Sequence, residues 1–162
     1  MTNYICINGK KAELTEEQMK ALGIELPKVN PFERVKKEDG VDVYFINSMG
    51  YIQKAWDTHN FLYEVGNYCT DKAIMEQRAL HETLNRLLWR YSMEHDGDKV
   101  NWETTEDKWS IAYDENYKDF KAYVFNSYHY IGAIYFNTKE IAEAAIKTII
   151  KPFMKAHPDF KW

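Results

Sequence analysis

The sequence predicts an α+β fold: an antiparallel sheet built from two strand-strand-helix units, with helices packed on it, and an N-terminal hairpin-helix appendage. Three observations favour this class. Aromatic, strand-like residues run into a threonine-started helix at positions 68–71 and again at 136–139. Both helices carry an apolar stripe at helical spacing, which has to pack on another layer. Short β-rich runs are separated by turn residues.

The appendage is expected at residues 1–23. Asn8-Gly9 joins two short runs in the manner of a two-residue hairpin turn. Thr15 and Gln18 have the spacing of a capping box, and Gly23 supplies a helix stop. Residues 24–40 hold two prolines and mixed charge without periodicity, so they are predicted to form a linker or an extended arm.

The main domain is expected at 41–162, with similar units at 41–95 and 108–157. In the first unit, strands at 42–48 and 51–57 flank a turn at Met49-Gly50, and a less regular aromatic segment follows at 61–68. Thr70 is the predicted cap of the long helix, which ends near residues 95–97. The apolar stripe of that helix comprises Leu80, Leu84, Leu87, Leu88 and Tyr91.

The second unit repeats this order. Strands are predicted at 109–114, 120–126 and 131–136, and Asn137 with Glu140 could cap the following helix. Pro152 is expected to bend or end that helix. Its buried stripe comprises Ala142, Ala145, Ile146, Ile149, Ile150 and Phe153, and the aromatic tail could fold back on it.

Composition limits the function. The net charge of −4 disfavours non-specific binding to nucleic acid, which needs a basic face. Two distant cysteines give no disulfide framework, and no apolar run is long enough to span a membrane. These features predict a cytoplasmic protein.

Catalytic motifs are missing from the sequence. It contains no nucleotide-binding glycine motif, and none of the five histidines has a partner at metal-ligand spacing. We therefore expect no catalytic residues, no metal and no cofactor, and interpret the protein as a non-enzyme.

Two clusters have the composition of a binding surface. Arg86, Trp89 and Arg90 lie on one side of the long helix, and arginine with tryptophan is typical of interface hot spots and of anion recognition. Both arginines also belong to a ladder of alternating charge at i, i+4 spacing on this helix. Such a ladder stabilises an exposed helix face, so helix stability alone is a second explanation of the cluster. The second cluster is the loop Tyr128, His129 and Tyr130, which strand ends could equally explain.

Acidic residues suggest a third surface. Glu106, Asp107, Asp114 and Glu115 precede or join the strands of the second unit, together with Glu103 and Asp119. They could present negative charge where a nuclease expects phosphates.

A resemblance covers nearly the whole chain. Its motifs are Ile7-Asn8-Gly9-Lys10, residues 30–35, Gly66-Asn67-Tyr68, residues 79–91, Ile134-Tyr135-Phe136, Thr138-Lys139-Glu140, Ala142-Glu143, Lys151-Pro152-Phe153 and Pro158-Asp159-Phe160. In these segments the chain resembles small uncharacterised proteins of phages and prophages of Firmicutes. The resemblance implies work inside a bacterial host, and by analogy an anti-CRISPR or other anti-defence role.

Three functions follow as hypotheses. The leading one is a non-enzymatic inhibitor that binds a host defence effector, such as a Cas nuclease. The second is a sponge that sequesters a signalling nucleotide. The base would stack on aromatic rings, and the phosphates would pair with Arg86 or Arg90. The third is a nucleic-acid-binding accessory protein. A homodimer is also compatible with the sequence.

Overall fold

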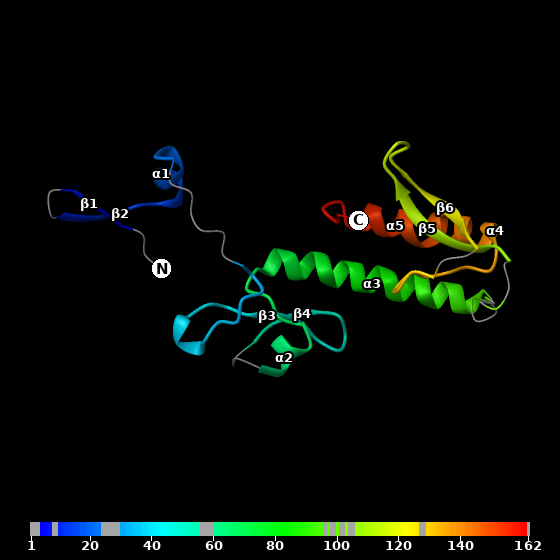
Figure 1. Ribbon diagram of the computed structural model, residues 1–162, viewed down its shortest axis with the longest axis horizontal. Helices are drawn as coiled ribbons and strands as arrows, with labels where there is room; N and C mark the ends of the chain where they lie inside the picture. Colours follow the sequence, from blue (N-terminus) through cyan, green and yellow to red (C-terminus); the bar gives the residue numbers. More distant parts are fainter. Residues whose placement is uncertain are drawn as a thin grey trace. The chain divides into compact units, whose positions relative to one another are not determined.

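The computed structural model describes residues 4–7, 10–23, 30–55, 60–95, 97, 100, 103, 106–126 and 129–161. The chain divides into two compact units, Met1–Glu33 and Arg34–Trp162, and the division falls within the predicted linker. Helices and antiparallel strands are both present (Figure 1), so the α+β class is confirmed. The described strands form three separate two-stranded sheets rather than one continuous sheet.

The N-terminal unit contains the predicted hairpin and helix. β1 (Tyr4–Ile7) pairs antiparallel with β2 (Lys10–Glu13), while the predicted Asn8-Gly9 turn lies outside the described residues. α1 (Glu16–Ala21) begins with the predicted capping box, in which Thr15 and Gln18 bond each other's backbone amides. The helix ends before Gly23, whose φ of 68° suits a residue without a side chain.

The larger unit opens with a 3-10 turn, η1 (Lys37–Asp39), and a short hairpin. β3 (Tyr44–Ile46) pairs with β4 (Ile52–Lys54), so both predicted strands are present but shorter than expected. The aromatic segment that follows begins with a short helix, α2 (Asn60–Glu64). We call β3 and β4 with their turn the first hairpin.

The free edge of β3 is covered by the residues just before the long helix. Tyr44 and Cys69 exchange two backbone hydrogen bonds of 2.8 and 3.1 Å, which makes an isolated antiparallel bridge. Beside it, the Asn67 side-chain amide accepts from the Ile46 N–H at 2.9 Å and donates to the Ile46 carbonyl at 2.6 Å. The amide thus replaces a peptide group of a third strand and satisfies edge groups that would otherwise stay unpaired.

The long helix α3 spans Lys72–Glu94, and its end before His95 was predicted correctly. Its N-cap differs from the prediction. Asp71, not Thr70, caps the helix, since the Asp71 carboxylate accepts from the amides of Ala73 and Ile74 at 2.8 and 3.3 Å. A carboxylate at this position also interacts favourably with the helix dipole.

The second hairpin repeats the arrangement. β5 (Lys108–Asp114) pairs with β6 (Asp119–Phe125) along their whole length. The predicted third strand at 131–136 is wrong in extent, because only Phe136 bridges β5, through two backbone bonds with Trp109. The Ser110 hydroxyl adds a bond to the Ile134 carbonyl at 2.9 Å. Both halves therefore share one plan: a hairpin, a single bridge and a helix.

The last helical segment runs through α4 (Lys139–Ala145), a π-helical turn η3 (Ile146–Ile150) and α5 (Lys151–Ala156). Thr138 caps it by accepting from the Ile141 amide, so the predicted capping by Asn137 and Glu140 is wrong. Pro152 does not end the helix. It stands in the first turn after the π turn, where its missing N–H is tolerated.

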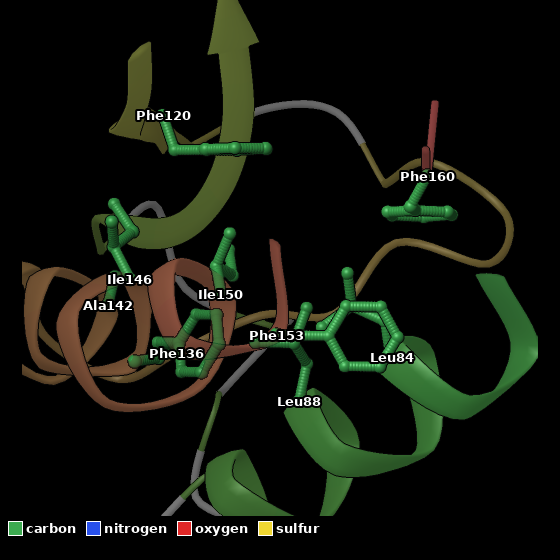
Figure 2. Packing of buried hydrophobic residues seen from close by; sticks show 10 residues of the cluster. Leu84, Leu88, Phe120, Phe136, Ala142, Ile146, Ile150, Phe153 and Phe160 are labelled. Carbon is green, nitrogen blue, oxygen red and sulfur yellow. The ribbon is translucent and has the colours of Figure 1, made fainter. Parts of the chain in front are cut away.

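The main core joins α3, the second hairpin and the last helical segment (Figure 2). Leu84 and Leu88 of α3 are buried as predicted, and Phe160 of the tail folds back onto Phe153 with ring centroids 5.5 Å apart. The other buried members are Phe120, Phe136, Ala142, Ala145, Ile146 and Ile150. Leu80, Leu87, Tyr91 and Ile149, also predicted, pack against the cluster while partly buried.

A second, smaller core was not predicted. It joins the start of α3, through Met75 and Ala79, to the first hairpin and Cys69. Met75 and Leu84 are nine positions apart, which is roughly half a turn out of phase on a helix with 100° per residue. The two cores therefore occupy opposite faces of α3, as the placement of the hairpins about that helix indicates (Figure 1).

The corrected cap gives a stability prediction. Thr138→Ala should lower the free energy of unfolding by about 1 kcal/mol, because the Ile141 amide loses its acceptor. The matched control is Asn137→Ala, an exposed residue that should cost less than ~0.5 kcal/mol. Urea unfolding followed by circular dichroism measures both, and the reverse order of effects would contradict the assignment of Thr138 as the cap.

Candidate binding surface

The predicted residues Arg86, Trp89 and Arg90 lie together on α3. The Trp89 side chain is 59% exposed although it belongs to the longest helix of the described chain. Arg86 and Arg90 follow one another at i, i+4 spacing, and Trp89 is one turn from Arg86. An exposed indole beside two guanidinium groups is typical of interface hot spots.

The turn of the first hairpin extends this cluster. Met49 is 73% and Tyr51 67% exposed, and Asn47 fixes the turn by accepting from the amides of both residues at 3.0 Å. A Cβ placed on Gly50 would lie 2.8 Å from Nη2 of Arg86. The turn therefore touches Arg86, and we call the residues Met49, Tyr51, Arg86, Trp89 and Arg90 the arginine–tryptophan surface.

The surface continues the α3 face that the first hairpin covers. Ala79, Arg86 and Met93 are spaced two helical turns apart and share one side of the helix. Ala79 is buried by the first hairpin, whereas Met93 is 37% exposed. The hairpin thus covers the first half of this face and leaves the second half open.

Both arginines already have partners. Arg86 lies 3.6 Å from Glu82 and donates to the Thr83 hydroxyl at 3.1 Å, and Arg90 lies 3.7 Å from Glu94. These ion pairs are exposed, so each contributes little to stability and a stronger partner could replace it. The ion pairs of the predicted charge ladder are therefore formed, and they stabilise the exposed face of the helix to this small extent.

The second predicted cluster lies on the loop after β6. Tyr128 is outside the described residues. Tyr130 is 54% exposed, its N–H donates to the Tyr135 hydroxyl at 2.9 Å, and its ring meets Phe125 edge-on at 5.4 Å. The His129 ring packs edge-on against Tyr135 at 5.5 Å. The loop is thus anchored by its own aromatic contacts.

This loop continues toward α3. Residues 132–134 line a small groove with Asn85 and Leu88, and the buried Ser92 hydroxyl donates to the Tyr135 carbonyl at 2.5 Å. Trp89 lies between Asn85 and Ser92 on the same side of the helix. The loop that carries the second cluster therefore reaches the helix of the first cluster through residues 132–135.

The predicted acidic residues are mostly engaged. Asp114 lies 3.4 Å from Lys121, and Glu115 lies 2.5 Å from Lys118. The Glu106 carbonyl accepts from Nζ of the buried Lys108 at 2.7 Å, and Asp107 is exposed beside it. The turn between β5 and β6 therefore carries compensated charge rather than an open acidic patch.

Asp114 is held in its ionised form. The Tyr123 hydroxyl donates to it at 2.7 Å and is the main reason that the pKa of Asp114 lies below its usual value. The amides of Asn116 and Tyr117 and the Lys121 ammonium act in the same direction. The same bond raises the pKa of Tyr123, because ionisation of the phenol would remove the donor.

Two grooves were missed from the sequence. The larger, of about 590 Å³, lies between the first hairpin, α3 and the C-terminal tail. Gln77 fixes the tail there by donating to the Asp159 carbonyl at 3.0 Å and accepting from the Lys161 N–H at 2.9 Å. No local pattern links the tail to this helix, so sequence reasoning had no signal for the groove.

The smaller groove, of about 440 Å³, lies between β6 and the last helical segment. Four lysines line it, namely Lys121, Lys139, Lys147 and Lys151. A signal was present in the sequence, because Lys139, Glu143, Lys147 and Lys151 recur every fourth position.

The described residues include no candidate metal cluster and one buried free thiol. No group of three His, Cys, Asp or Glu side chains there could hold a metal ion. Cys69 is buried, and burial raises the pKa of its thiol, which lowers the thiolate fraction at neutral pH. In the described part of the chain, no helix has the length and apolar character needed to cross a membrane.

Fold and site together define an α+β protein with an exposed arginine–tryptophan surface and a lysine-lined groove. Comparison with protein-family models, curated proteins and solved structures finds no match to this chain.

The Asp114 contact gives a pH prediction. Its folded pKa lies below the unfolded value of about 4, so its stabilising contribution is present above that pH and is lost as pH falls through the folded pKa. Tyr123→Phe should raise the pKa of Asp114, because the main hydrogen bond is lost. NMR titration of the Asp114 carboxyl carbon measures this, with Tyr117→Phe as control. An unchanged pKa of Asp114 in Tyr123→Phe would show that the tyrosine hydroxyl does not cause the shift.

Proposed function

We propose that the protein is a non-enzymatic inhibitor that binds a bacterial defence effector, is encoded by a phage or prophage, and works in the host cytoplasm. The resemblance to phage proteins motivates the choice of partner. The contact is made by the arginine–tryptophan surface. A Cas nuclease is one effector of this kind.

The observation that carries the proposal is the exposed Trp89. Leaving a large indole in water on a well-packed helix has a hydrophobic cost that binding would recover. Arg86 and Arg90 flank it with cations, and Met49 and Tyr51 add apolar area. This composition fits a partner that offers an apolar pocket bordered by carboxylates.

The same geometry revises the predicted mode of inhibition. Mimicry of phosphates by Asp114 and Glu115 has less support, because both carboxylates already pair with lysines. Nucleotide capture by Arg86 and Arg90 would have to displace the glutamate with which each arginine pairs on its own helix. The apolar part of a protein contact, which is made by the Trp89 ring, requires neither set of pairs to be broken.

The first test is capture of the partner. The tagged full-length chain is passed through lysate of a bacterium that carries defence systems, and the eluate is resolved by mass spectrometry. A defence protein recovered in stoichiometric amount supports the proposal. Recovery of no defence protein would refute it.

The second test localises the contact. Trp89→Ala should weaken binding of the captured partner by about 2 kcal/mol or more, which is roughly thirtyfold in Kd, because the central aromatic contact is lost. Calorimetric titration measures the change. Tyr117→Ala is the matched control, since Tyr117 is 70% exposed on the turn of the second hairpin. Equal losses in both variants would place the interface elsewhere.

A further inference from the structure

We infer that the lysine-lined groove between β6 and the last helical segment binds a small phosphorylated ligand of nucleotide size. This site is separate from the arginine–tryptophan surface and does not depend on the function proposed above. It consists of Phe120, Lys121 and Ala122 on β6 and Lys139, Glu143, Ile146, Lys147 and Lys151 on the helix.

The charge of the groove is opposite to that of the protein. The whole chain has a net charge of −4, yet four lysines and a single carboxylate line this groove. Phe120, Ala122 and Ile146 supply an apolar floor. Ammonium groups around an apolar floor suit a ligand with a phosphate and a less polar body.

The π turn aligns the lysines. In an α-helix, positions four apart drift by roughly 40° at each step, so Lys139, Lys147 and Lys151 would wind around the helix. The π turn at Ile146–Ile150 bonds the Lys151 N–H to the Ile146 carbonyl, with more residues in the turn, which offsets part of that drift. All three lysines consequently line one groove.

The lysines are held near the groove but remain available. Lys139 lies 3.5 Å from Glu143, Lys151 lies 3.1 Å from Asp119, and Lys121 lies 3.4 Å from Asp114. The members of these pairs are mostly exposed, and a phosphate dianion would compete for the ammonium groups. Lys147 makes no ion pair with any residue that the structure describes.

Aromatic rings border two of the lysines. The Lys121 ammonium lies 2.8 Å from the centroid of the Tyr117 ring, and the Lys139 ammonium lies 5.9 Å from that of Trp109. Tyr117 lies outside the lining of the groove and is 70% exposed, so the ring face opposite Lys121 is open to a planar group. A base-bearing phosphate fits this chemistry better than phosphate alone.

A volume of about 440 Å³ favours a small ligand over a nucleic acid strand. Strand binding uses a continuous basic track with successive stacking rings. Here Glu143 lies among the lining lysines, and Asp114 and Asp119 next to the groove pair with Lys121 and Lys151.

The test uses the full chain at low ionic strength with adenosine 5′-monophosphate as the probe, followed by NMR or calorimetry. Wild type should bind at millimolar concentration or below. Lys147→Glu should weaken binding by about tenfold, because an attractive charge becomes repulsive in the groove. Lys155→Glu, the same change at an exposed position of α5 outside the groove, should leave Kd within about twofold.

Inorganic phosphate, adenosine and a single-stranded oligonucleotide separate the ligand classes. Weaker binding of phosphate and no binding of adenosine support the inference. Absence of adenosine-monophosphate binding, equal weakening in both variants, or much tighter binding of the oligonucleotide would each overturn it. Lys147 is exposed and outside any described ion pair, so both variants should fold, which circular dichroism checks.

Discussion

The larger unit depends on one constraint, which is that the single helix α3 contributes side chains to two separate cores. Each hairpin has only two strands, too few to be stable alone in water, so each needs an apolar surface to cover it. Met75 and Ala79 provide that surface for the first hairpin on one face of α3. On the opposite face, Leu84 and Leu88 join the core in which α4 packs directly on the second hairpin. The 23-residue length of α3 allows these faces to follow one another along its axis.

This arrangement explains where the open surfaces lie. The first hairpin reaches only as far as Arg86, so the same face of α3 beyond it stays uncovered and exposes Trp89. In the second half, the last helical segment packs on the hairpin through its buried stripe and leaves its lysine row beside β6. Both candidate sites thus lie at the edge of an apolar packing interface.

Parts of this fold were predictable from the sequence. The stripe at Leu84 and Leu88 and the stripe from Ala142 to Phe153 were found because one helical phase dominates each segment. The second core was not predicted, because Met75 and Ala79 belong to an apolar stripe of different helical phase on the same helix. The longer stripe dominates the periodicity of the helix and conceals the shorter one.

The local errors have physical causes as well. Thr70 and Asp71 are both good capping residues, and only the backbone conformation decides which one accepts the helix amides. The third strand at 131–136 was overestimated, since only the Phe136 bridge and the Ser110 hydroxyl bond connect this segment to β5. Arg86, Trp89 and Arg90 were grouped correctly from helical spacing, but their contact with the Gly50 turn is long-range and has no local signature.

Native-state hydrogen exchange tests the shared helix most directly. If α3 joins the two cores, its amides near Met75 and near Leu84 should exchange only through a common opening, and Met75→Ala should lower protection in both halves by the same amount. A Met75→Ala variant that loses protection around the first hairpin alone, with the second half unchanged, would show that the cores are independent and contradict the account.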